Sequence, residues 1–200
     1  MALLMSTTKL VLSTGVAAFG SLIGAASWYT RDVLAVEADA TLLKSTEQDA
    51  FVDTFYYKQR LEETPKVKFS PVLLAKSLYF SPLFQPERLI LSIARYTLPT
   101  ENEFDHLPIK TGTQMACWAV QEQGDSHLLM SFPAGHTYLK ANYLSETSEL
   151  EFWFGSNLST EASVSPIVKA AMPFHSWYSR ILCKNIASTL SKYLKRRVDL

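Results

Sequence analysis

The stretch PFHSWYSRILCKNIASTLSKYL, residues 173–194, decides the fold. Large apolar side chains recur in it every three to four residues, which is the spacing of one face of an α-helix. Pro173 is typical of the first position of a helix, where the missing N–H is not needed. The stretch therefore predicts a long amphipathic C-terminal helix that lies with its apolar side against a sheet. Its other face carries Arg180, Lys184, Ser188 and Lys192.

The residues between Gly112 and this helix form short extended runs separated by turn residues, which is typical of an antiparallel meander. Upstream, the aromatic and β-branched stretch 51–57 predicts a further strand with Phe51, Phe55 and Tyr57 on one side. Pro166 restricts the last run of the meander to a sheet edge or a bulge. The predicted strands of the meander are 115–121, 127–132, 138–144, 150–154 and 162–168.

Two short helices are expected between the first strand and the meander. Ser70-Pro71 and Gln85-Pro86 each place a polar residue before a proline, which is typical of a helix start. The second helix ends before Pro99, and a loop is predicted over 100–112. The spacing of the apolar residues predicts one buried face on each of these two helices. The expected buried residues are Leu73, Leu74 and Leu78 on the first helix, and Leu89, Ile90, Ile93 and Ala94 on the second.

The N-terminal region contains one uncharged apolar segment, Leu10 to Thr30. As a helix it would be about 31 Å long, close to the thickness of the hydrocarbon core of a bilayer. Lys9 and Arg31 flank the segment, and Trp28 and Tyr29 stand where an interfacial aromatic belt is expected. These features favour a single transmembrane helix that anchors the protein in a lipid membrane.

Small residues in this segment suggest what else the anchor contacts. Gly20 and Gly24 form a small-xxx-small pattern, so one helix face can pack against a transmembrane helix of a larger membrane complex. Two other interpretations stay open, because Gly24-Ala25-Ala26 resembles a secretory cleavage site and the lack of acids is typical of organelle targeting. The expected location is accordingly a membrane such as the mitochondrial inner membrane, with secretion after cleavage as the alternative. The expected organisation is an anchor or targeting segment at 1–31, a linker at 32–49 and a folded domain at 50–198.

Composition excludes several classes of function. Lys plus Arg and Asp plus Glu number 19 each, so no net charge favours binding to nucleic acid. Cys117 and Cys183 are far apart without a CxxC pattern, and no histidine pair has the i, i+4 spacing of a helical metal site. Because phosphate-binding loops and dinucleotide fingerprints are also absent from the sequence, neither a metal nor a cofactor is expected.

Three stretches of the chain carry a resemblance to a known family. They are Ser70-Pro71 through Arg95, the run from Ile109-Lys110-Thr111-Gly112 through Trp118-Ala119-Val120 to His127-Leu128-Leu129, and Met172-Pro173-Phe174-His175. With the element order they resemble an uncharacterised bacterial and fungal family of the helix-grip superfamily, which includes polyketide cyclases, START lipid carriers and the birch-pollen allergen. The resemblance implies an α+β fold whose curved antiparallel sheet wraps the C-terminal helix. The chain departs from that family at Pro133-Ala134-Gly135, where the family has two acids before the histidine that matches His136.

Helix-grip proteins commonly hold an apolar ligand between sheet and helix. The resemblance therefore implies a non-catalytic domain that binds a hydrophobic small molecule or lipid. A packing role is the more common one for large apolar residues, so each candidate has that alternative. The candidate lining residues are Phe55, Tyr57, Trp118, Met130, Tyr138, Tyr143, Phe152, Phe154, Trp177, Tyr178 and Ile181.

Two alternative functions compete with ligand binding. An accessory subunit of a membrane complex would need only the Gly20 and Gly24 face. A cyclase or dehydratase would need a general base, for which His106, His136 and His175 are the candidates. Asp105 stands beside His106 and could orient its imidazole, although a solvated pair in a loop is the simpler interpretation.

Overall fold

The computed structural model describes residues 24, 25, 27–45 and 51–195. It divides the chain into two compact units with the boundary between Asp32 and Val33. In the first unit, Gly24 is helical and the Arg31 guanidinium lies 5.0 Å from the centre of the Trp28 ring. No helix within the described ranges is long and apolar enough to cross a membrane. Most of the predicted span, including Gly20, lies outside the described residues.

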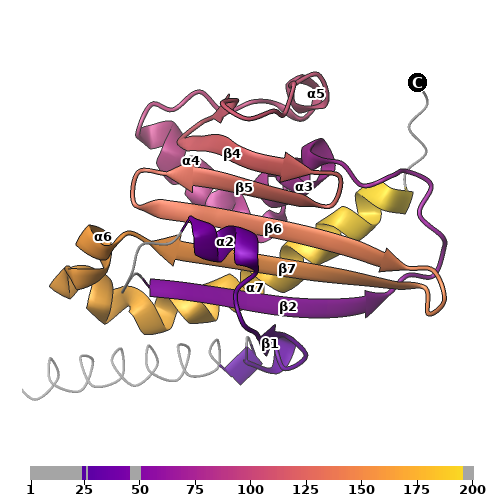
Figure 1. Cartoon of the computed structure of the whole chain (residues 1–200), viewed down its shortest axis with the longest axis horizontal. Helices are drawn as coiled ribbons and strands as arrows, with labels where there is room; N and C mark the ends of the chain where they lie inside the picture. The colour runs from indigo at the N-terminus through magenta and orange to yellow at the C-terminus, as the bar shows by residue number, and fades with distance from the viewer. Residues whose placement is uncertain (1–23, 26, 46–50, 196–200) are drawn as a thin grey trace, which may run out of the picture. The chain divides into compact units, whose positions relative to one another are not determined.

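The second unit is α+β and contains a seven-stranded antiparallel sheet in the order β1-β2-β7-β6-β5-β4-β3 (Figure 1). Strands β4 to β7 form the predicted meander, and β2 pairs with β7 along its whole length. The strands are β1 Leu34–Ala35, β2 Phe51–Arg60, β3 Gln114–Met115, β4 Trp118–Gly124, β5 His127–Phe132, β6 Gly135–Leu144 and β7 Glu149–Leu158.

Two helices begin where the proline signals predict. The Leu73 N–H donates to Ser70 Oγ at 3.2 Å, and the next helix begins at Gln85. The expected buried face of that second helix is wrong, because Leu89, Ile90 and Ile93 are exposed to solvent. The helices are α2 Ala40–Lys44, α3 Pro71–Tyr79, α4 Gln85–Ile93, α5 Glu101–Asp105, α6 Thr160–Val164 and α7 Pro166–Lys195, with a 3₁₀ turn, η1, at Pro82–Phe84.

The C-terminal helix is longer than predicted. It begins at Pro166, so Pro173 lies inside it, and the predicted strand 162–168 is wrong. Ser159 caps α6 by accepting the Ala162 N–H at 3.3 Å, and Pro166 then occupies a first helical turn, where a proline is tolerated. The helix-forming run from Lys169 to Met172 carries α7 up to Pro173, whose missing N–H costs one backbone bond.

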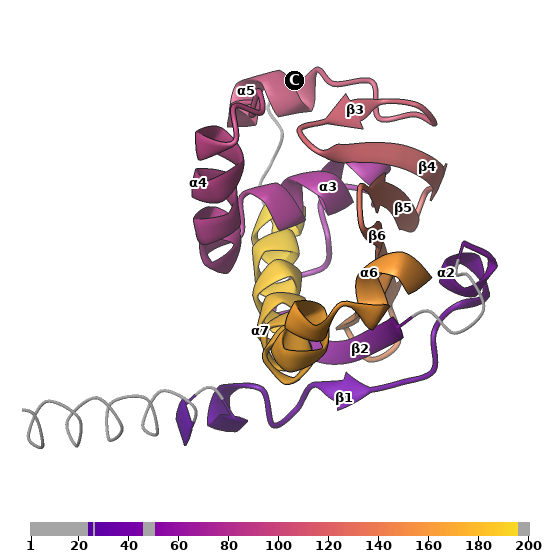
Figure 2. The same cartoon turned by 90° about the vertical axis from the view of Figure 1, so that its left-hand side faces the viewer.

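The core fills the space between the sheet and the helices on one of its faces. Figure 2 shows α3 and α7 on that face and α2 on the opposite one. On α7, the side chains of Ile186, Leu190 and Leu194 are fully buried in the main cluster. On the opposite face Leu42 of α2 packs against Leu129 and Tyr138.

Part of the predicted linker is structured. Strand β1 pairs with β2, and Asp39 caps α2 by accepting the Thr41 N–H at 2.9 Å. Lys140 Nζ lies 2.8 Å from Asp39 Oδ2, which joins this segment to β6. Although burial opposes ionisation, the bonds from Lys140 and Thr41 lower the pKa of Asp39 to about 2. Residues 33–45 therefore belong to the second unit.

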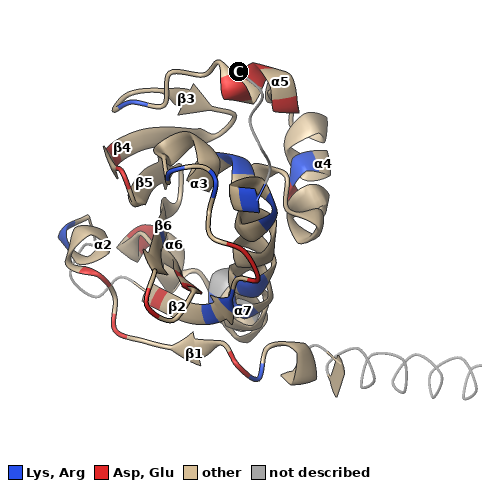
Figure 3. Ribbon diagram, turned by 90° about the vertical axis from the view of Figure 1, so that its right-hand side faces the viewer, with Lys and Arg blue, Asp and Glu red and all other residues tan. Residues whose placement is uncertain are grey.

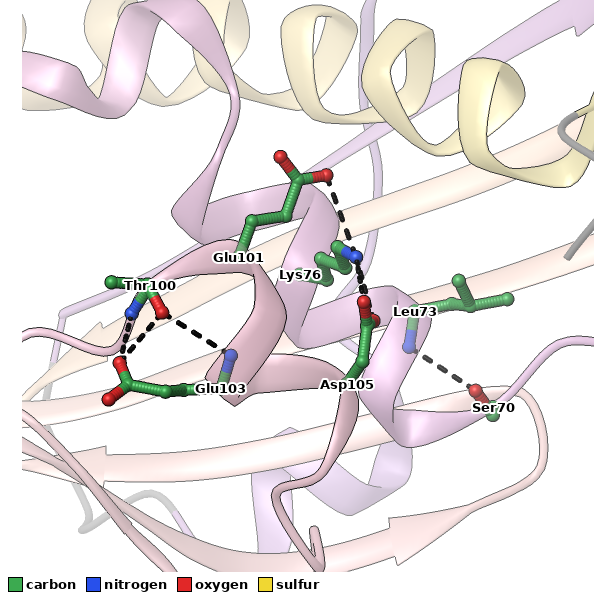
Figure 4. Close-up of polar contacts among 7 residues, drawn as sticks. All are labelled: Ser70, Leu73, Lys76, Thr100, Glu101, Glu103 and Asp105. Atoms are coloured by element: carbon green, nitrogen blue, oxygen red, sulfur yellow. Dashed lines mark hydrogen bonds and ion pairs between the residues drawn. The ribbon is translucent and has the colours of Figure 1, made fainter. Parts of the chain in front are cut away.

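The predicted loop 100–112 also contains a helix, α5. Ion pairs connect this helix to α3. Thr100 and Glu103 form a reciprocal capping box that starts α5. Lys76 of α3 is almost fully buried and donates to both carboxylate oxygens of Asp105, at 2.7 and 2.8 Å, with Glu101 at 3.5 Å (Figure 4). The Asp105 carboxylate thus compensates the buried ammonium of Lys76.

We predict that Asp105→Asn lowers the free energy of unfolding by about 1–3 kcal/mol, because it leaves the Lys76 charge with weaker compensation. Lys76→Met removes that charge and should cost less than about 1 kcal/mol. Urea denaturation at pH 7, followed by tryptophan fluorescence, measures both. An equal loss in the two variants would contradict the role of Asp105.

Candidate functional site

Most of the predicted lining residues lie in one packed cluster between the sheet and α7. Met130 and Phe152 are fully buried there. Tyr138 lies on the opposite face with Leu42, and Trp177 and Ile181 lie outside the cluster. The middle of the expected cavity is therefore filled by side chains. The predicted residues in the cluster are Phe55, Tyr57, Trp118, Met130, Tyr143, Phe152, Phe154 and Tyr178.

Two surface pockets lie toward the two ends of the strands that carry this cluster. The first, which we call the Tyr143 pocket, has a volume of about 740 Å³ and lies between residues 64–69 and the end of β6. The second, the Asp53 pocket, has a volume of about 520 Å³ and lies between the start of β2 and α7. Only the Asp53 pocket has a buried carboxylate in its wall, so it is the stronger of these two candidates.

The walls of the Asp53 pocket are mainly apolar. They include two of the predicted lining residues, Phe55 and Trp177. The Arg180 guanidinium lies 5.5 Å from the centre of the Phe55 ring, within the range of a cation–π contact. The complete lining is Ala35, Val36, Phe51, Val52, Asp53, Thr54, Phe55, Ser176, Trp177 and Arg180.

Asp53 is held by a small polar cluster that joins three elements. Ser156 of β7 donates from Oγ to Asp53 Oδ1 at 2.6 Å, and Ser176 of α7 donates to Oδ2 at 3.5 Å. His175 Nε2 lies 3.0 Å from Ser156 Oγ and 3.7 Å from Asp53 Oδ2. The His175 and Phe51 rings also form a T-shaped contact, with the ring centres 5.9 Å apart.

Burial governs the charge of this carboxyl group. The Asp53 side chain is only 8 % exposed, and this desolvation raises its pKa above the ordinary value. Hydrogen bonds from Ser156 and Ser176 and the proximity of His175 oppose that rise without cancelling it. An acid with a raised pKa at the wall of a pocket is a frequent sign of a functional site.

The cluster does not have the order of a nucleophilic triad. In such a triad the acid and the serine contact different ring nitrogens of the histidine. Here Ser156 and Asp53 both lie near Nε2 of His175, and the Ser156 hydroxyl donates its proton to Asp53. The arrangement therefore lacks the hydrogen-bond order by which a triad activates its serine.

The three candidate histidines lie apart. His136 is on β6, where its Nδ1 lies 3.0 Å from Asn157 Oδ1, on the opposite face of the sheet from His175. His106 follows the last residue of α5, and its neighbour Asp105 is engaged by Lys76. Only His175 therefore has a carboxylate and a hydroxyl group beside it.

The two cysteines and the possible metal ligands are the remaining candidates for chemistry. Cys183 is buried and Cys117 is half-buried, and burial raises the pKa of both thiols. Among the residues that the structure describes, no cluster of histidine, cysteine and acidic side chains could hold a metal ion.

Sequence reasoning missed Asp53, although a signal was present. In a strand that alternates, residue 53 lies on the same side as Phe51, Phe55 and Tyr57. An acid on an otherwise apolar inward face must find partners, and Ser156 and His175 supply them from distant parts of the chain. Those partners could not be identified without the pairing of β2 with β7.

Comparison with known proteins gives no functional precedent. No family model matches the chain, and no curated protein matches it. A solved structure of a conserved protein of unknown function from Enterococcus faecalis is similar over 84% of this chain and 91% of that chain, at 10% sequence identity and a TM-score of 0.34.

We predict that Asp53→Asn raises the melting temperature at pH 7 by about 2–4 °C, because it removes a buried ionisable group. A carboxyl with a raised pKa stabilises the fold most below its ordinary pKa, and this contribution is lost as the pH rises through the raised value. The difference between variant and wild type should therefore vanish in acid. Thermal denaturation from pH 3 to pH 8 measures it.

The matched control is Ser156→Ala, which leaves the charge of Asp53 and removes its best hydrogen bond. This variant should be less stable than wild type at pH 7 by about 1–3 kcal/mol. If Asp53→Asn and Ser156→Ala were destabilised equally at pH 7, ionised Asp53 would be a net stabilising group and the prediction would be wrong.

Proposed function

We propose that this chain is a membrane-tethered, non-catalytic domain of helix-grip type that binds a small amphipathic, lipid-like molecule in the Asp53 pocket. The observation that carries the proposal is the combination of aromatic walls with a buried carboxyl group in one pocket of about 520 Å³. That volume lies within the range of small-molecule sites.

The pocket wall specifies the chemistry of the ligand. Phe51, Phe55 and Trp177 suit an aliphatic or aromatic body. Asp53 offers an acceptor and Arg180 offers donors, so the head group should both donate and accept hydrogen bonds. A molecule with only an apolar body would cover these polar groups without making a hydrogen bond to them, so it would bind less well.

A binding role agrees better with the polar cluster than a catalytic one. In a catalytic triad His175 would take the proton of Ser156 through one ring nitrogen while Asp53 held the other, but here both Ser156 Oγ and Asp53 Oδ2 lie near Nε2. The strand also holds Ser156 in a buried position, away from bulk solvent. The cluster therefore serves to fix the orientation of Asp53 at the pocket wall.

The membrane tether supplies the source of the ligand. The apolar segment 10–30 would hold the domain next to a bilayer, where amphipathic molecules are concentrated. A pocket that opens to the surface, rather than a closed interior cavity, allows such a molecule to enter without unfolding of the core.

Filling the pocket tests the proposal. The full chain is purified in mild detergent, and bound small molecules are identified by native mass spectrometry and solvent extraction. We expect an amphipathic molecule to accompany the wild type and its amount to fall about tenfold in Ser176→Phe, since the added ring narrows the pocket beside Asp53, which Ser176 contacts.

The matched control is Ser126→Phe, the same change at the Tyr143 pocket. This variant should keep the ligand. If no molecule accompanies the wild type, ligand binding is wrong, and if Ser126→Phe alone loses the molecule, the ligand occupies the Tyr143 pocket instead.

A further inference from the structure

Helix α4 is amphipathic with its apolar side turned outward. Leu89 is 63 % exposed, Ile90 64 % and Ile93 74 %. None of the nine residues of α4, all of which the structure describes, is buried. An amphipathic helix of a globular domain normally turns its apolar side toward the core. We call these three residues the α4 face.

Polar side chains occupy the inner side of the same helix. The Arg88 guanidinium lies 4.7 Å from the centre of the Phe80 ring, and Nη2 donates to the Pro99 carbonyl at 3.4 Å. Glu87 lies near the Tyr178 hydroxyl, and burial raises the pKa of the Glu87 carboxyl group. Within the described residues, Glu87 Oε2 and Arg88 Nε are buried without a hydrogen-bond partner. This orientation is unfavourable in water for both sides of the helix.

Further exposed apolar groups lie next to the base of α4. Tyr178 donates from its hydroxyl to the Leu83 carbonyl at 2.9 Å, and the Phe174 ring stacks on Tyr178 at 6.2 Å between centres. Phe174 is 59 % exposed and Leu83 39 %. The charged residues of α4 are Glu87 and Arg88, and the five residues that follow, Leu89 to Ile93, carry no charge (Figure 3).

The size of the α4 face favours a lipid surface over a protein partner. Its exposed fractions add up to about two whole side chains, on the order of 200–300 Å² of apolar surface. A standard protein–protein interface takes about 800 Å² from each partner. A bilayer needs no matching surface, and a short apolar face is sufficient when a second anchor already holds the protein there.

The sequence places such an anchor close to the domain. The uncharged apolar segment ends at Thr30, and the second unit begins at Val33. Three residues span at most about 11 Å, so a bilayer-inserted segment would keep the domain against the membrane. Tethering at that distance raises the effective concentration of the bilayer at the domain surface.

We propose that the α4 face inserts into the interfacial layer of the membrane to which the chain is tethered. Leu89, Ile90 and Ile93 enter the region between head groups and acyl chains, while Glu87 and Arg88 stay on the domain side. This inference shares the tether with the proposed function and is independent of the Asp53 pocket.

Photo-crosslinking to lipid tests the inference. The full chain is reconstituted into vesicles of equal parts phosphatidylcholine and phosphatidylglycerol that contain a phosphatidylcholine with a diazirine on its acyl chain. After irradiation, lipid adducts are mapped by mass spectrometry of peptides. We expect adducts on α4, and we expect them to fall about tenfold in the double variant Ile90→Asp, Ile93→Asp.

The matched control is Leu144→Asp, which introduces a charge at an exposed apolar residue at the end of β6. It should leave the adducts on α4 unchanged. Both changes are at exposed positions, and an unaltered melting temperature verifies that each variant is folded. Adducts on α4 that Leu144→Asp reduces as strongly as the double variant would count against a specific α4 contact.

Three other outcomes overturn the inference. Adducts only within residues 10–30 would show that the anchor inserts and the α4 face does not. Crosslinks from α4 to a second copy would assign the face to self-association. If the chain did not float with the vesicles in a density gradient, it would not be bound to the membrane and the proposed tether would be wrong. Loss of the ligand in Ser176→Phe is measured separately, so failure of the pocket and failure of the membrane contact are distinguishable.

Discussion

The burial of α7 against strands β2 and β7 is the contact on which the second unit depends. Ile186, Leu190 and Leu194 of α7 lie in one buried cluster with the sheet residues Phe152 and Met130. Because β2 and β7 pair along their whole length, residues 51–60 and 149–158, which are far apart in the sequence, are fixed to each other. The position of α7 also places the Asp53 pocket and the polar cluster. Both lie beside residues 175–180 of α7, before the part of the helix that is fully buried in the core.

Local patterns predict the sheet well and the helices less well. The strands from β4 to β7 alternate or are uniformly apolar, and turn residues separate them, so their positions depend on neighbouring residues alone. Strand 162–168 was wrong because a proline after a polar residue fits a helix start as well as a strand edge. The extension of α7 before Pro173 had no sequence signal stronger than that proline.

The sites were harder to predict because they depend on contacts between distant residues. The spacing of Leu89, Ile90 and Ile93 predicts a helix with one apolar face, and the structure contains that helix. The direction of that face depends on the contact of Arg88 with the Phe80 ring and on Glu87 near Tyr178. Contacts between distant residues cannot be predicted from the spacing of apolar residues within one helix. Asp53 is similar, because its partners come from β7 and α7.

The two edges of the sheet have a consequence for crowding. Both edge strands, β1 and β3, are only two residues long, so each covers only part of its neighbour, β2 or β4. A protein confined to a plane meets its own copies far more often than one free in solution. With the proposed tether, the uncovered backbone of β2 and β4 is therefore where neighbouring copies would pair at high surface density.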